Sequence, residues 1–175
     1  MSCPIYLINL PRDEQRLRVM QQQLDAMQLP FRRMDAVYGK DLSAAERASL
    51  YDEARNRRSY HQIMTPGEIG CYASHLRVWQ DLAASPHAHA LVLEDDVELL
   101  PQLPAVLAAM DELAPQWDMI KLVGRDHERS LRAWRTAFST VNSGSGFADQ
   151  SGSARPGRCT ENHCSVTAWR SFSPA

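Results

Sequence analysis

The sequence predicts an α/β fold built on a mostly parallel β-sheet with helices on both faces. Short apolar runs, typical of buried strands, alternate along the chain with segments whose apolar residues recur at helical spacing. The most apolar run, residues 88–93, leads directly into three carboxylates, Glu94, Asp95 and Asp96. This alternation is typical of strand–helix–strand units, whose strands lie parallel in one sheet.

Each predicted element rests on a local pattern. Short, mainly apolar runs predict strands at residues 4–10, 88–93 and 119–122, and we expect a further short strand at residues 31–36, closed by Gly39. We expect helices where apolar residues recur every three or four positions or where a capping residue stands at the start. These segments are residues 12–27, 43–54, 65–83 and 103–113. Ser43 and Thr65 each precede a glutamate by three residues, which is the capping-box pattern. Residues 55–61 are polar and basic and are predicted to form a loop.

The signals for secondary structure stop after Gly124. Among residues 126–175, six are Leu, Ile, Val, Met or Phe and nine are Ser, so little apolar surface can be buried to offset the entropy of ordering. We therefore divide the chain into a folded part, residues 1–124, and an irregular or disordered tail, residues 125–175. All seven basic residues of the tail are Arg, a composition that a frameshift in a GC-rich gene would produce.

Composition limits the class of protein. The 175 residues are 44% apolar and 23% charged, as in an ordinary soluble domain. The net charge of −2 gives no reason to expect a nucleic-acid partner. No apolar run is long enough for a transmembrane segment, and no basic segment precedes the first one, so we expect a cytoplasmic protein. Cys3 and Cys71 are expected to be buried thiols, and Cys159 and Cys164 beside His163 offer too few ligands for a zinc site.

The three carboxylates stand at the carboxyl end of the strand predicted at 88–93. Open parallel sheets bind ligands at that edge. Neighbouring carboxylates repel one another, and a hard cation such as Mg²⁺ or Mn²⁺, which shares its coordination with substrate phosphates, would stabilise them. From the triplet alone, a metal–diphosphate site and a solvated acidic turn are equally good interpretations.

Four segments resemble, in order, the motifs of glycosyltransferase family 25, which includes lipooligosaccharide and collagen galactosyltransferases. They are Ile-Tyr-Leu-Ile-Asn-Leu-Pro-Arg at 5–12, Met-Asp-Ala-Val with the following glycine at 34–39, Thr-Pro-Gly-Glu-Ile-Gly-Cys-Tyr-Ala-Ser-His at 65–75, and Leu-Val-Leu-Glu-Asp-Asp at 91–96. The third and fourth motifs are specific together, although neither is specific alone. The resemblance covers residues 4 to about 124.

This resemblance implies a glycosyltransferase-A-like (Rossmann-like) fold in which residues 1–124 bind the nucleotide-sugar donor. It implies transfer of a sugar, galactose in many members, from a UDP-sugar to a glycan or lipooligosaccharide acceptor. It also implies a divalent cation, Mn²⁺ or Mg²⁺, held by Asp96 and Glu94. If the acceptor is a surface glycan, the protein could associate peripherally with the inner face of the cytoplasmic membrane.

The other donor-binding candidates stand at predicted strand ends or at a helix start: Asn9, Leu10, Arg12, Ala36, Gly39, Gly67 and Asp95. Asn9 and Leu10 end the first strand, where the backbone usually meets the base in this fold. Arg12 and Arg16 could reach phosphate. Gly67 would allow an anionic group to approach a helix N-terminus closely.

The histidines are weaker candidates. His75 lies within the predicted helix 65–83, where a lone histidine is more often structural than catalytic. His87 and His89 lie at the opposite end of the strand from Glu94, so they cannot bind the same metal.

The catalytic base stays unassigned, because neither Asp149 nor Glu161 matches a motif of the family. Two alternatives to an active transferase remain: a non-catalytic relic that binds nucleotide, and a metal-dependent phosphate hydrolase. A haloacid-dehalogenase-type phosphatase needs an aspartate two residues before a second aspartate, and this chain has Glu94 there. We expect little transferase turnover from the chain, because residues 1–124 offer no acceptor wall.

Overall fold

The computed structural model describes residues 3–59, 62–112, 117–122 and 166–170. Its elements, in chain order, are β1 (Ile5–Asn9), α1 (Glu14–Ala26), β2 (Arg32–Asp35), α2 (Ala44–Leu50), α3 (Glu53–Ser59), α4 (Pro66–Ala83), β3 (His89–Glu94), α5 (Leu103–Glu112), β4 (Met119–Lys121) and β5 (Val166–Arg170). The strands form one sheet in the order β2-β1-β3-β5-β4.

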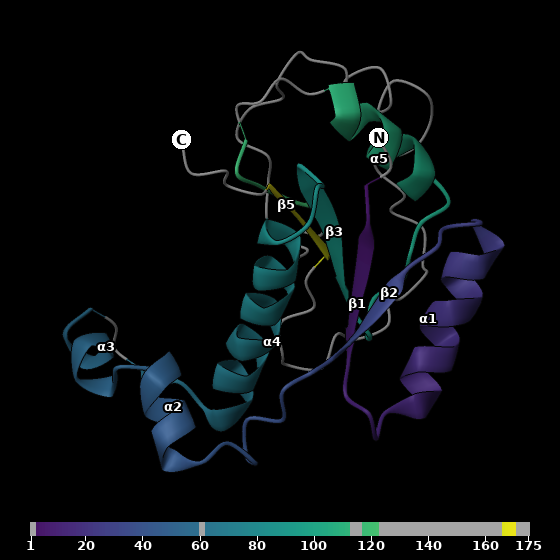
Figure 1. The fold of residues 1–175 in the computed structure, drawn as a ribbon. Helices are drawn as coiled ribbons and strands as arrows, with labels where there is room; N and C mark the ends of the chain where they lie inside the picture. Colours follow the sequence, from purple (N-terminus) through teal and green to yellow (C-terminus); the bar gives the residue numbers. More distant parts are fainter. Residues whose placement is uncertain (1–2, 60–61, 113–116, 123–165, 171–175) are drawn as a thin grey trace, which may run out of the picture.

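The predicted α/β fold is confirmed. β1 pairs in parallel with β2 on one side and with β3 on the other, and helices lie on both sides of these three strands (Figure 1). β5 extends the sheet beyond β3 and is antiparallel to both β3 and β4. The parallel strands at the centre, with helices between them in the chain, are those of a Rossmann-like α/β unit.

Alternate residues of the central strands point into two separate cores. One core joins the sheet to α1 and α5, and its members on β1 and β3 are Ile5, Leu7, Leu91 and Leu93. The other joins the sheet to α4, and its members on the same strands are Tyr6, Ile8, Ala90 and Val92. Because both faces are covered, the strands read as continuous apolar runs rather than as alternating polar and apolar residues.

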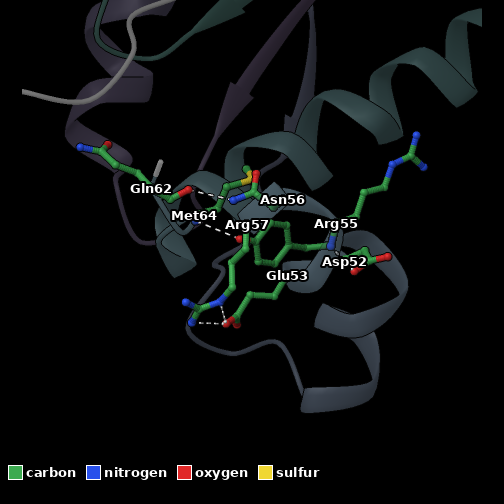
Figure 2. Close-up of polar contacts among 8 residues, drawn as sticks. Asp52, Glu53, Arg55, Asn56, Arg57, Gln62 and Met64 are labelled. Atoms are coloured by element: carbon green, nitrogen blue, oxygen red, sulfur yellow. Dashed lines mark hydrogen bonds and ion pairs between the residues drawn. The ribbon is translucent and has the colours of Figure 1, made fainter. Parts of the chain in front are cut away.

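Residues 55–61 were predicted to form a loop, and this prediction was wrong for residues 55–59, which belong to α3; residues 60 and 61 lie outside the described residues. The helix predicted at 43–54 ends at Leu50, Tyr51 is extended, and the separate helix α3 follows. The carboxylate of Asp52 accepts a hydrogen bond from the backbone N–H of Arg55 (2.8 Å), in the manner of an N-cap. Glu53 and Arg57, one turn apart, form an ion pair of 2.7 Å (Figure 2). These local contacts explain a helix that has no apolar stripe.

The fifth strand also departs from the sequence prediction. No strand was predicted beyond Gly124, yet Val166–Arg170 pairs along both β3 and β4. A five-residue segment containing valine, threonine and tryptophan is a good strand former, but it is too short to recognise without its neighbours. The rest of the tail lies outside the described residues, so the boundary at Gly124 and the frameshift remain predictions.

A hydrogen-bonded cluster ties β1, β2 and α4 together on the α4 face of the sheet. The hydroxyl of Tyr6 donates to Asp81 Oδ2 (2.7 Å), and Arg32 donates to the same oxygen (2.7 Å). Burial, and then the hydrogen bond to the Asp81 carboxylate, raises the pKa of Tyr6 to about 12. The fold therefore favours the neutral hydroxyl.

We expect Tyr6→Phe to lower the free energy of unfolding by about 1–2 kcal/mol at neutral pH, because a hydrogen bond to a charged group is lost while Arg32 still neutralises Asp81. In the parent chain this contribution is complete below the ordinary tyrosine pKa of about 10 and is lost as the pH rises towards 12. Urea unfolding at about pH 8 and pH 11 should show the two chains converging. Tyr72→Phe, at an exposed tyrosine, is the control. Equal stabilities of parent and Tyr6→Phe at pH 8 would contradict the prediction.

Candidate functional site at the carboxyl edge of the sheet

The carboxyl ends of β1, β2 and β3 meet at one edge of the sheet, where β1 leads into α1 (Figure 1). The register pairs Asn9 with Asp35 and Ile8 with Glu94, so the last residues of the three strands lie side by side. This is the edge at which parallel α/β sheets bind their ligands.

Asn9 organises the centre of this edge. Its side chain is buried, with 1% exposed, and its amide nitrogen donates to Asp95 Oδ2 (2.6 Å) and to the carbonyl of Asp13 (3.1 Å). Its amide oxygen accepts from Arg33 Nε (3.0 Å). A buried amide with all these partners is a rigid part of the structure. Its neighbour Leu10 accepts a backbone hydrogen bond from Asp13 and so closes the turn into α1.

The three carboxylates that follow β3 have different surroundings. Asp95 is held by Asn9 and by Arg16 of α1, whose guanidinium lies 3.2 Å from Asp95 Oδ1. Burial, followed by the negative charges of Glu94 and Asp95, raises the pKa of Asp96. Three oxygen-bearing groups whose charges disfavour one another fit a hard divalent cation. The charge of Glu94 acts on Asp96, the other predicted metal ligand, whereas the carboxylate of Asp95 is bound by Arg16.

Glu94 also contacts α4. Its Oε1 lies 3.1 Å from Nε2 of His75 and accepts a hydrogen bond from the thiol of Cys71 (3.7 Å). Burial, followed by the charges of Glu94 and Asp96, raises the pKa of Cys71 to about 12. Cys71 was predicted to be a buried thiol, but it is half-buried and faces the site, as does His75. The spacing of four residues, which puts both side chains on one helix face, was the signal that the sequence analysis missed.

The segment after β2 is fastened to α4. The backbone N–H of Ala36 donates to the carbonyl of Asn9 (3.0 Å), and that of Val37 donates to Ser74 Oγ (2.8 Å). Gly39 is buried against the backbone of α4, where a Cβ would overlap the carbonyl of Pro66. Ala36 thus lies beside the strand end as predicted, whereas the close approach at Gly39 is to protein backbone.

Gly67 is exposed, and the nearest atom to a Cβ placed there is Thr65 Oγ1 at 3.8 Å. The capping box predicted at the start of α4 is present: Thr65 accepts from the N–H of Glu68, and the Glu68 carboxylate accepts from the N–H of Thr65. The helix start is therefore formed as expected, while the described residues do not crowd Gly67.

Arg12 lies over the ring of Tyr38, with its guanidinium carbon 3.9 Å from the ring centroid. The hydrogen bond from Arg12 lowers the pKa of the Tyr38 hydroxyl. Arg12 follows β1 and Tyr38 follows β2, so both stand at the same edge of the sheet. Tyr38 was missing from the sequence prediction, although its position within the second motif could have suggested it.

The rejection of His87 and His89 agrees with the structure. His89 begins β3, at the end opposite Glu94, and its ring lies 5.7 Å from that of Trp117.

No helix within the described ranges is long and apolar enough to cross a membrane.

The comparisons with known proteins agree with the motifs. The family described as "Glycosyltransferase family 25 (LPS biosynthesis protein)" matches residues 2–143. The chain is 30% identical to "Procollagen galactosyltransferase 1-A" of Xenopus laevis over 67% of its own length and 20% of that protein. It is 32% identical to a "Glycosyltransferase 25 family member" of Aedes aegypti over 78% of its length and 24% of that protein. It is also 30% identical to "Probable inactive glycosyltransferase 25 family member 3" of Rattus norvegicus, over 67% of its own length and 22% of that protein.

The chain belongs to glycosyltransferase family 25. It spans about a fifth to a quarter of the length of these relatives. The family match runs to residue 143, further than the limit near Gly124 that the motifs alone had given.

Proposed function

We propose that residues 1–124 bind the nucleotide-sugar donor of a glycosyltransferase that transfers galactose from UDP-galactose to a glycan acceptor. Membership of family 25 supports the transferase over the phosphate hydrolase. The name of the Xenopus relative supports galactose, and the description of the family supports an acceptor in lipopolysaccharide or lipooligosaccharide synthesis. That acceptor would place the protein in the cytoplasm, at the inner face of the cytoplasmic membrane.

The observation that carries the proposal is the convergence of Asn9, Arg16, Glu94, Asp95 and Asp96 at one sheet edge. Asp96 and Glu94 would hold Mn²⁺ or Mg²⁺, which stabilises the charge that develops on the leaving diphosphate. Asn9 and Arg16 hold the carboxylate of Asp95, so the turn that carries Asp96 has a defined position.

Further groups at this edge are suited to the nucleotide. Arg12, stacked on the half-buried ring of Tyr38, provides a positive charge beside the end of β1. The backbone of Leu10 and Ala36 follows the ends of β1 and β2, where the base would lie, and Gly67 leaves the start of α4 open to an anionic group. The base that takes the acceptor proton stays unassigned.

A nucleotide-binding relic without turnover is the second candidate. One observation favours it: a relative of similar identity bears the name "Probable inactive glycosyltransferase 25 family member 3". Both candidates require the donor site, so a binding experiment tests what they share and a turnover assay separates them.

We expect UDP to bind only with a divalent cation and with Asp96 in place. Calorimetric titration of UDP in Mn²⁺ should give a measurable affinity that falls at least about tenfold, or about 1.4 kcal/mol, with EDTA or with Asp96→Ala. The physical reason is that without the cation the diphosphate would face carboxylates directly.

Glu98→Ala is the matched control, because it removes an exposed carboxylate two residues further on. It should bind UDP as the parent chain does. Equal affinity for UDP in Mn²⁺, in EDTA and in Asp96→Ala would refute the proposed metal site.

A further inference from the structure

Three side chains of different chemistry meet between α4 and the end of β3: the thiol of Cys71, the imidazole of His75 and the carboxylate of Glu94. We call them the thiol–imidazole–carboxylate cluster. Their potential ligand atoms all lie within 4.8 Å of one another. Cys71 and His75 are one helical turn apart on α4, and Glu94 reaches them from the sheet.

The distances in the cluster are close to those of a tetrahedral metal site. Bond lengths of 2.0–2.3 Å to zinc place neighbouring ligand atoms about 3.4–3.6 Å apart. Here Glu94 Oε1 lies 3.7 Å from the Cys71 sulfur and 3.1 Å from His75 Nε2. Shifts of a few tenths of an ångström at these two contacts, with the thiol and imidazole closing from a separation of at most 4.8 Å, would let one ion contact all three groups.

The ligand types distinguish this cluster from the carboxylates of the proposed donor site. Sulfur and imidazole nitrogen favour borderline-soft ions such as Zn²⁺ and Co²⁺, whereas Mg²⁺ prefers oxygen alone. The side chains of the cluster belong to two elements, α4 and β3, that are packed against each other through a core formed by Val78, Leu82, Ala90 and Val92.

We infer that the thiol–imidazole–carboxylate cluster is a site for a zinc-like divalent cation, with water as the fourth ligand. The ion replaces the hydrogen bonds that Cys71 and His75 make to Glu94. On binding, the thiol proton passes to solvent and His75 binds as the neutral tautomer, with its proton on Nδ1 instead of Nε2. The site differs from the Mg²⁺ or Mn²⁺ site proposed at Asp96 in its thiol and imidazole ligands, and the two sites have Glu94 in common. It does not depend on the proposed function, because it requires neither nucleotide nor acceptor.

Co²⁺ alone is the probe, because a cobalt–thiolate bond gives a charge-transfer band in the near ultraviolet and tetrahedral Co²⁺ gives strong visible bands. The full chain is used with Cys159→Ser and Cys164→Ser, so that the cysteines beside His163 cannot contribute. We expect both sets of bands to saturate at one Co²⁺ per chain, Zn²⁺ to remove them stoichiometrically, and Mg²⁺ to leave them unchanged.

Substitutions assign the ligands. Cys71→Ser should abolish the charge-transfer band, and His75→Gln should weaken Co²⁺ binding at least about tenfold, since even the outer partners of metal ligands are worth about 10- to 100-fold. Cys3→Ser is the matched control for the thiol and should keep the band. Asp96→Ala should also keep it while losing Mn²⁺-dependent UDP binding, which distinguishes a failure of this inference from a failure of the proposed function.

Circular dichroism and thermal melting of each variant establish that it is folded. If Cys71→Ser does not fold, the parent spectrum, its removal by Zn²⁺ and the His75→Gln titration decide. A folded parent chain without a charge-transfer band, or a band of equal strength in folded Cys71→Ser, would overturn the inference.

Discussion

Asn9→Asp is expected to destabilise the fold by about 3–5 kcal/mol, the cost of leaving a buried charge without compensation. The substitution keeps the shape of the side chain but replaces its amide donor by a carboxylate oxygen. The amide nitrogen of Asn9 lies 2.6 Å from Asp95 Oδ2, so the new oxygen would face a carboxylate in a position that is 1% exposed. Arg33, on the other side, is already hydrogen-bonded to the position and can offset only part of the repulsion.

Asn56→Asp is the matched control for this prediction. Asn56 lies on α3, donates to the carbonyl of Gln62 (2.8 Å) and has Arg55 and Arg57 as chain neighbours (Figure 2). The same chemical change at this partly exposed site removes one hydrogen bond and should lower the stability by about 1 kcal/mol, well below the effect at Asn9. Chemical denaturation of parent, Asn9→Asp and Asn56→Asp measures both effects. Losses of similar size in the two variants would show that Asn9 has no special role at the sheet edge.

The parts of the fold predicted correctly are those encoded by local patterns. Continuous apolar runs such as Leu91–Leu93 identified strands buried on both faces, and the capping boxes at Ser43 and Thr65 placed two helix starts. The errors have the opposite cause. α3 depends on a cap from Asp52 and an ion pair rather than on an apolar stripe, and β5 acquires its structure by pairing with distant strands.

In the candidate site, as in the fold, only the features encoded by a local pattern were predictable from the sequence. The position of Asp95 and Asp96 at a strand end follows from the sequence, since the strand pattern and the acidic triplet are adjacent. The neutralisation of Asp95 by Arg16, and the contact of Glu94 with α4, depend on how a helix packs against the sheet. Contacts between residues about 20 to 80 positions apart carry no local signal, so they could not be predicted from spacing.

Gly67 was predicted to let a ligand approach a helix start, but the close approach in the first turns of α4 is at Gly70. A Cβ at Gly70 would lie 2.5 Å from the carbonyl oxygen of Val37 and 2.6 Å from the backbone nitrogen of Gly39. Both obstacles are backbone atoms, and the segment is also held by the hydrogen bond from Val37 to Ser74. The loop after β2 can therefore lie against α4 only because position 70 has no side chain.

We expect Gly70→Ala to lower the free energy of unfolding by about 3 kcal/mol, the upper part of the usual range for overpacking, because backbone cannot move aside as a flexible side chain would. Gly67→Ala, three residues earlier in the same helix, should raise it by about 0.5–1 kcal/mol, since alanine loses less conformational freedom than glycine in a helix. Urea denaturation of the two variants beside the parent chain measures both changes.

The same substitution should also affect ligand binding. The displaced loop should disturb Ala36, whose backbone is hydrogen-bonded to Asn9, so Gly70→Ala should weaken Mn²⁺-dependent UDP binding. UDP binding by Gly67→Ala tests whether the ligand needs the open start of α4. A Gly70→Ala chain as stable as Gly67→Ala would show that the loop has room to shift and that the contact between Gly39 and Gly70 is not required.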